Sequence, residues 1–190
     1  MNTMKTIKSI LLIAIVLTAS AFSAPTTDRK EIKEATITWK GKKILGSHNG
    51  TIDLTSGYLE MIGDDIVGGM FNVDMTSLAV TDLEGGKKEK LEGHLKSDDF
   101  FGVANHPTAT LSIKSATREA NSYQVTGDFT IKGETQEIVF ELEMGESGAR
   151  AAVKIDRTKF GIQYGSGSFS DKLADNTISD KFELDIIMKF

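Results

Sequence analysis

The chain has 190 residues, a formal net charge of −5 at pH 7 and no cysteine. The acidic balance argues against nucleic acid or an anionic membrane surface as the partner, because both attract basic proteins. The lack of cysteine excludes disulfides, thiol nucleophiles and cysteine-based zinc sites. The fold must therefore be stabilised by packing and by main-chain hydrogen bonds.

The N-terminus has the three regions of a secretory signal peptide. Lys5 and Lys8 supply positive charge, residues 10–17 form an apolar run, and residues 19–21 (Ala-Ser-Ala) match the small-residue cleavage pattern. Eight apolar residues are too few to span a bilayer core of about 30 Å, which argues against a transmembrane anchor. We therefore expect this segment to direct export.

Two cleavage sites compete at the end of this segment. Cleavage after Ala21 is favoured over cleavage after Ala24, because Pro25 directly follows the second site. The sequence thus predicts a signal peptide over residues 1–21, a flexible lead-in over residues 22–33 and one domain over residues 34–190. The mature protein is expected to be periplasmic or secreted.

From residue 34 onward, apolar side chains return at every second position, as in Phe71, Val73 and Met75. This period is typical of strands with one apolar face and one polar face. A turn is expected at Ser56-Gly57, and Gly68-Gly69 predicts a bulge or a sharp bend inside a strand. The predicted strands cover residues 35–40, 48–54, 58–62, 66–75, 108–117, 122–132, 136–144, 149–156 and 178–190.

Two segments break the strand pattern. Residues 87–97 are rich in helix formers and place Leu91, His94 and Leu95 on one helical face. We expect this helix to pack across one end of the domain. Residues 157–175 are rich in glycine and serine, which predicts an irregular crossover.

With so little helix, eight or nine strands can bury their apolar faces only against one another. A barrel or a sandwich follows. The residues alone leave two interiors open, a cavity and a solid core, because small barrels can be packed full. Bulky aromatics mixed with methionines suit either interior.

Five sequence blocks follow one another across nearly the whole predicted domain. They are WKGKKILGSHNG (39–50), GMFNVDMTSL (69–78), HLKSDDFF (94–101) followed by His106-Pro107, GDFTIKG (127–133) and IDRTKFG (155–161). Together they resemble the YceI-like family of exported, lipocalin-like barrels that bind long isoprenoid or other amphiphilic lipids. One departure lies in the third block, where Asn105-His106 precedes Pro107 and the family more often has an aromatic residue. A different shape is expected for that loop.

The resemblance implies an all-β fold, an eight-stranded antiparallel lipocalin-like barrel with one or two short helices at its mouth. It implies an elongated apolar cavity for a lipid-like small molecule, with no catalytic residues and no cofactor. Neither nucleic acid nor stable membrane insertion is expected. The residues expected to line the cavity are Ile37, Trp39, Ile52, Phe71, Val73, Met75, Leu91, Leu95, Leu111, Phe129, Ile131, Phe140, Phe182 and Leu184.

Two polar residues are candidates for contacting a ligand head group. His94 could point into the cavity mouth or bond to a buried carbonyl. Arg157 could clamp a phosphate, or it could instead tie down the crossover. The three histidines, His48, His94 and His106, form neither an i,i+4 pair nor an H-x-H doublet. Hydrogen bonding is therefore expected of them rather than metal binding.

Catalysis has little support in the sequence. Ser166 and Ser168 lie among glycines, but the segment lacks the strand-to-helix elbow of a serine hydrolase. His94 and Asp98 share a helical face and are the best available acid–base pair.

Three hypotheses for the function therefore stand. The first is a periplasmic carrier for an isoprenoid, a quinone or a fatty-acid-like amphiphile. The second is a structural or partner-binding barrel with a filled core, and the third is an enzyme acting on an isoprenoid lipid. The sequence favours the carrier.

Overall fold

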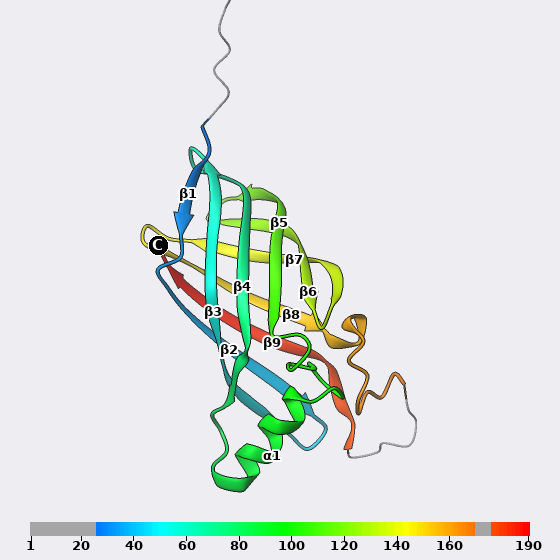
Figure 1. Cartoon of the computed structure of the whole chain (residues 1–190). Helices are drawn as coiled ribbons and strands as arrows, with labels where there is room; N and C mark the ends of the chain where they lie inside the picture. Colours follow the sequence, from blue (N-terminus) through cyan, green and yellow to red (C-terminus); the bar gives the residue numbers. More distant parts are fainter. Residues whose placement is uncertain (1–25, 170–175) are drawn as a thin grey trace, which may run out of the picture.

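The computed structural model describes residues 26–169 and 176–190, which form a closed antiparallel barrel (Figure 1). Its eight strands follow one another around the ring in chain order, and the last strand pairs with the first. This confirms the predicted eight-stranded barrel. The strands are β2 (Glu34–Lys43), β3 (Gly46–Ile62), β4 (Asp65–Val80), β5 (Thr108–Glu119), β6 (Ser122–Ile131), β7 (Glu134–Met144), β8 (Gly148–Asp156) and β9 (Ile178–Lys189).

One end of the barrel carries most of the irregular structure. Helix α1 (Gly85–Lys96) joins β4 to β5 there, beside the turn between β2 and β3 and the connection from β8 to β9 (Figure 1). That connection begins with the short 3-10 helix η1 (Arg157–Phe160). We call this end the collar: α1, the turn Ile44-Leu45 and the described residues between β8 and β9. None of the described helices is long and apolar enough to cross a bilayer.

A short additional strand lies in the segment expected to be a flexible lead-in. Strand β1 (Asp28–Glu31) pairs antiparallel with the far end of β3, where Asp28 faces Met61 and Glu31 faces Tyr58. The pairing is a main-chain interaction and requires no apolar pattern, so the polar sequence gave no sign of it. Arg29 adds an ion pair to Glu60 (3.3 Å).

The turn expected at Ser56-Gly57 is wrong, because β3 continues unbroken from Gly46 to Ile62. The ladder with β4 shifts register between Leu54 and Ser56, so the chain bulges there without reversing. Gly57 makes room for a neighbouring ring: a Cβ there would lie 2.7 Å from the Phe71 side chain. The glycine marks a close approach inside the barrel rather than a turn.

The predicted bulge and helix agree with the structure, whereas one strand is longer than expected. The β3–β4 ladder shifts register between Glu60 and Met61, beside Gly68, which confirms the bulge predicted at the glycine pair. The expected helix over residues 87–97 is α1, which begins two residues earlier and ends one residue earlier. Strand β4 runs on to Val80, five residues beyond the predicted end.

The ring has one short ladder, between β7 and β8. It runs only from Leu142 opposite Ala151 to Met144 opposite Ala149, near the end away from the collar. Towards the collar, η1 packs against β7. Phe160 of η1 is buried and meets the Phe129 ring edge-on (centroids 6.1 Å apart). This side chain fills the space where the two strands separate.

The pairing of a tryptophan with a glycine on the neighbouring strand positions one wall of the barrel. Trp39 on β2 pairs with Gly50 on β3, and the indole N–H donates to the carbonyls of Thr51 (3.3 Å) and Ala79 (3.2 Å). A Cβ at residue 50 would lie 1.8 Å from the Ala79 oxygen and 2.6 Å from the indole. Only glycine lets the ring lie flat against β3.

Gly50→Ala should therefore lower the free energy of unfolding by about 1–3 kcal/mol, because main chain and indole must both move. Gly41→Ala is the matched control on the same wall, since a Cβ there meets nothing within 4 Å. Urea denaturation of both variants tests the prediction. Equal stability of the two variants would contradict it.

Candidate functional site

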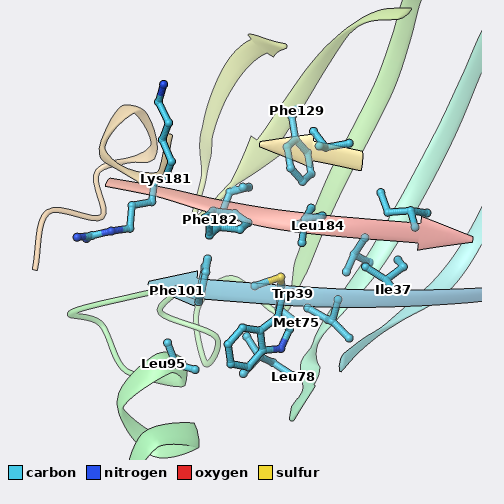
Figure 2. A pocket seen from close by; sticks show the side chains of 18 of the residues that line it. Ile37, Trp39, Met75, Leu78, Leu95, Phe101, Phe129, Lys181, Phe182 and Leu184 are labelled. Atoms are coloured by element: carbon cyan, nitrogen blue, oxygen red, sulfur yellow. The ribbon is translucent and has the colours of Figure 1, made fainter. Parts of the chain in front are cut away.

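The barrel encloses a cavity with a volume of about 630 Å³. Figure 2 shows Trp39 and Ile37 on β2 and Phe182 and Leu184 on β9 around it, with Phe129 beyond them. The volume lies within the roughly 300–1,000 Å³ of typical ligand pockets. The interior is therefore hollow rather than filled. The fourteen side chains expected from the sequence to line a cavity all lie on this wall, although their role in binding stays a prediction.

Strand alternation accounts for the apolar wall. On β9, Phe182, Leu184 and Ile186 face the cavity, whereas Glu183 and Asp185 face outward and pair with basic residues on neighbouring strands. The same alternation holds on β2 for Ile37, Trp39 and Gly41. It ends at the mouth, where Lys42 pairs with Glu183 (2.7 Å) and also reaches the lining. The outward ion pairs and the inward apolar residues together determine which face of a strand points into the barrel.

The polar part of the lining lies at the collar. Lys43 is the last residue of β2. Lys181 lies near the start of β9 (Figure 2). Both lysines are exposed, so the cavity reaches solvent at this end. Lys42, His48, His94 and Arg157 complete the basic part of the lining. No aspartate or glutamate lines the cavity in the described residues, so the ionisable side chains of the lining are basic or aromatic.

His94 lies in an aromatic cluster between α1 and the β8–β9 connection. Its ring meets Phe100 and Tyr164 edge-on, with centroids 4.9 Å and 4.5 Å apart. Its Nε2 atom lies 3.7 Å from a carboxylate oxygen of Asp99, and not within ion-pair distance of Asp98, the acid–base partner considered from the sequence. His94 lines the cavity, as a head-group contact requires, and it also fastens α1 to the connection.

Arg157 is almost completely buried, with 3% of its surface exposed. Its guanidinium donates four hydrogen bonds to main-chain carbonyls on both sides of the β8–β9 connection. Burial lowers the pKa of Arg157, and the Asp180 and Asp156 carboxylates oppose that shift. At most one N–H of the guanidinium therefore remains for a ligand. Arg157 holds the connection in place, which is the role expected from the sequence as the alternative to a phosphate clamp. The acceptors are the carbonyls of Ser179 (2.9 Å), Ile162 (2.9 Å), Tyr164 (2.8 Å) and Ile178 (3.1 Å).

His48 has a clear structural partner. Its Nδ1 atom lies 2.9 Å from a carboxylate oxygen of Asp82, which also accepts from the Asn49 N–H. Burial raises the pKa of Asp82, but these hydrogen bonds outweigh it and hold that pKa below its usual value. The pair fastens the start of β3 to the segment before α1. Across the described ranges, no three His, Asp or Glu side chains gather as a metal site would require.

The serines of the connection serve local structure. Ser166 is buried and its hydroxyl accepts from the Ser168 N–H (3.2 Å), while the Ser168 hydroxyl donates to Asp180. Neither serine has a histidine as its hydrogen-bond partner in the described part of the chain. The loop interpretation made from the sequence agrees with this geometry.

Sequence reasoning did not include several cavity residues in the site. Phe100 and Phe101 follow α1, and Tyr164 lies in the irregular connection, where no periodicity indicates which way a side chain points. Phe101 contacts Phe182 edge-on (6.2 Å), which joins the collar to the wall of β9. An aromatic residue within a glycine- and serine-rich segment was the one available signal for Tyr164.

Comparison with known proteins places this architecture among relatives. The model of the YceI-like domain family matches residues 29–190. A UPF0312 protein of Staphylococcus epidermidis is 34% identical over 107 residues, which cover 48% of this chain and 60% of that protein. A UPF0312 protein of Staphylococcus aureus is 34% identical over 89 residues, covering 41% and 50%. The chain therefore spans between half and about 60% of the length of these curated relatives.

Solved structures share the fold at low sequence identity. Burkholderia cenocepacia BcnA superposes with a TM-score of 0.65 at 15% identity, covering 81% of this chain and 94% of that one. A polyisoprenoid binding domain from Saccharophagus degradans gives a TM-score of 0.58 at 13% identity, covering 83% and 95%. A YceI protein of Campylobacter jejuni gives 0.53 at 17% identity, covering 97% and 98%.

Arg157→Lys should lower the free energy of unfolding by about 2–4 kcal/mol, because one ammonium cannot reach carbonyls that a fork-shaped guanidinium spans. The matched control is Arg150→Lys, whose ion pair to Asp185 is exposed and contributes less than about 1 kcal/mol. Chemical denaturation measures both changes. If Arg157→Lys is as stable as its control, the guanidinium does not hold the connection.

Proposed function

This chain belongs to the YceI-like domain family, and we propose that it is a binding protein that holds a long, mostly hydrocarbon ligand inside its barrel. The observation that carries the proposal is the apolar cavity of about 630 Å³, closed along its length by strands and open at the collar. The polyisoprenoid binding domain from Saccharophagus degradans, which has the same fold, supports the ligand class. A polyisoprenoid, an isoprenoid quinone and a fatty-acid-like amphiphile are the candidates.

The ligand would lie with its polar end at the collar. Lys43, His94 and Lys181 are the groups at the mouth that are best placed to meet it, because the guanidinium of Arg157 is largely occupied. A lining whose charges are all basic favours a head group with negative charge or strong acceptor oxygens. A fatty acid or a polyprenyl phosphate fits that requirement better than a neutral quinone.

Chain length alone should not decide which ligand binds. Burying about 40 carbons at roughly 0.8 kcal/mol per methylene would nominally give on the order of 30 kcal/mol. Non-covalent affinities saturate near about 18–21 kcal/mol, so the ordering of a long chain offsets much of that gain. The depth of the cavity and the chemistry of its mouth would therefore set the selectivity.

Leu184→Trp should weaken ligand binding at least about tenfold, because an indole would occupy space that the hydrocarbon needs. Ile187→Trp is the matched control, since Ile187 lies on the same strand but is 49% exposed on the outer face. The sole tryptophan of the wild type, Trp39, lines the cavity and reports binding by its fluorescence. In each variant, displacement of a fluorescent fatty acid replaces that signal.

Titrations with a fatty acid, a polyprenyl phosphate and an isoprenoid quinone, together with mass analysis of lipid extracted from the purified protein, test the function itself. Saturable binding of at least one of them, weakened in Leu184→Trp alone, is expected. No saturable binding and no co-purifying lipid would leave the carrier proposal without support.

The proposed carrier would act outside the cytoplasm. The support is the signal-like sequence of residues 1–21, which lies outside the described residues. We expect the exported protein to begin at Phe22. N-terminal sequencing of the protein from a periplasmic or secreted fraction checks this, and a full-length cytoplasmic product would refute the localisation.

A further inference from the structure

The turn between β2 and β3 exposes two large aliphatic side chains that the fold does not require. Ile44 is 61% exposed and Leu45 is 71% exposed, and no other large apolar side chain in the described residues is more exposed. The two residues make up the whole connection between Lys43 and Gly46, which face each other in the ladder. Such turns favour Gly, Asn, Asp and Ser, so an Ile-Leu pair there needs another explanation.

Two exposed aromatic side chains lie in the connection that the start of β9 joins to this turn. Tyr164 (48% exposed) and Phe169 (56%) belong to the β8–β9 connection. The start of β9 links the two segments, because Ile178 pairs with Lys43 on one side and donates its N–H to Gly165 O (2.7 Å) on the other. The remaining exposed apolar residues, Val67, Val139 and Ile187, lie on three separate strands. Isolated residues of that kind are normal, whereas a group at a cavity mouth is not.

Basic residues border the apolar group. Lys42 and Lys43 directly precede Ile44, and Lys181 lies across the mouth on β9. Lys42 is held by Glu183, but Lys43 and Lys181 form no ion pair with any described residue. Aliphatic and aromatic side chains flanked by lysines are the combination that peripheral proteins use at a bilayer surface.

We propose that the collar docks on the surface of a phospholipid bilayer, with Ile44 and Leu45 entering the headgroup region. This rests on the proposed function, because a long hydrocarbon ligand must pass between a bilayer and the cavity that opens at the same end. A convex tip of a few side chains suits a fluid apolar phase, whereas a protein partner would need a complementary surface of about 1,000 Å². The net charge of −5 opposes attachment by electrostatics alone, so the apolar tip provides most of the binding.

Vesicle flotation tests the docking. The full protein is mixed with vesicles of phosphatidylcholine, alone or with a quarter of phosphatidylglycerol. The Ile44→Thr/Leu45→Thr variant should reduce the bound fraction at least about fivefold on both vesicles. The matched control, Val139→Thr/Ile187→Thr, removes two exposed aliphatic side chains elsewhere and should bind like the wild type. Lys43→Ala should remove only the additional binding that phosphatidylglycerol provides.

Transfer of a bound fluorescent fatty acid to vesicles separates docking from ligand binding. In the wild type the transfer rate should rise with vesicle concentration, because transfer occurs on contact. In the Ile44→Thr/Leu45→Thr variant, which we call the tip variant, the transfer rate should not depend on vesicle concentration. Its affinity for the same fatty acid in solution should stay unchanged. Failure of that solution titration would count against the proposed function, whereas failure of flotation counts against docking.

Three outcomes overturn the docking proposal. The first is a wild type that does not float with either vesicle, and the second is equal flotation of the tip and control variants. The third is a wild-type dimer in sedimentation that becomes monomeric in Ile44→Thr/Leu45→Thr without any vesicle binding, which would assign the patch to a second copy of this chain. Thermal unfolding of both double variants verifies that they are folded before flotation is scored.

Discussion

The pairing of β2 with β9 is the interaction on which the cavity depends. These are the first and last strands of the ring, and their ladder runs from Glu34 opposite Lys189 to Lys43 opposite Ile178. Every other ladder of the ring joins strands that follow each other along the chain. Only this one brings the two ends of the domain together. Without it the sheet would have two open edges and its apolar face would lie in water.

The same ladder also determines where the mouth can lie. Beyond Gly41 its register shifts, and the first residues of β9 turn to the β8–β9 connection instead of continuing a regular pair with β2. Arg157 then fixes that connection by donating to carbonyls on both of its sides. A buried cation that donates to main-chain oxygens holds irregular backbone in place where no ladder can, and it does so without filling the cavity. The opening is thus a consequence of how the ring closes.

Alternation in the long strands limited the predicted fold to a barrel or a sandwich, and the resemblance to the YceI-like family selected the eight-stranded barrel. Alternation also predicted the inward residues, since a one-residue slip would place Phe182 and Leu184 outside and Glu183 inside. It did not predict that β3 is continuous at Gly57, because a glycine that admits the Phe71 ring looks the same in sequence as a glycine in a turn. Nor did it predict β1 or Tyr164, whose positions depend on main-chain pairing and tertiary contact rather than on periodicity.

The alternation of apolar residues did not decide whether the interior is solid or hollow, and the reason is geometric. Both interiors need apolar residues at the same positions, and they differ only in whether opposing side chains meet across the barrel. Here large side chains such as Phe160 and Phe100 are placed in the connections, where they seal a gap between strands or pack against His94. Glycines at residues 50 and 57 let other rings lie against the wall. Large side chains therefore line the barrel without meeting across it, and a cavity remains inside.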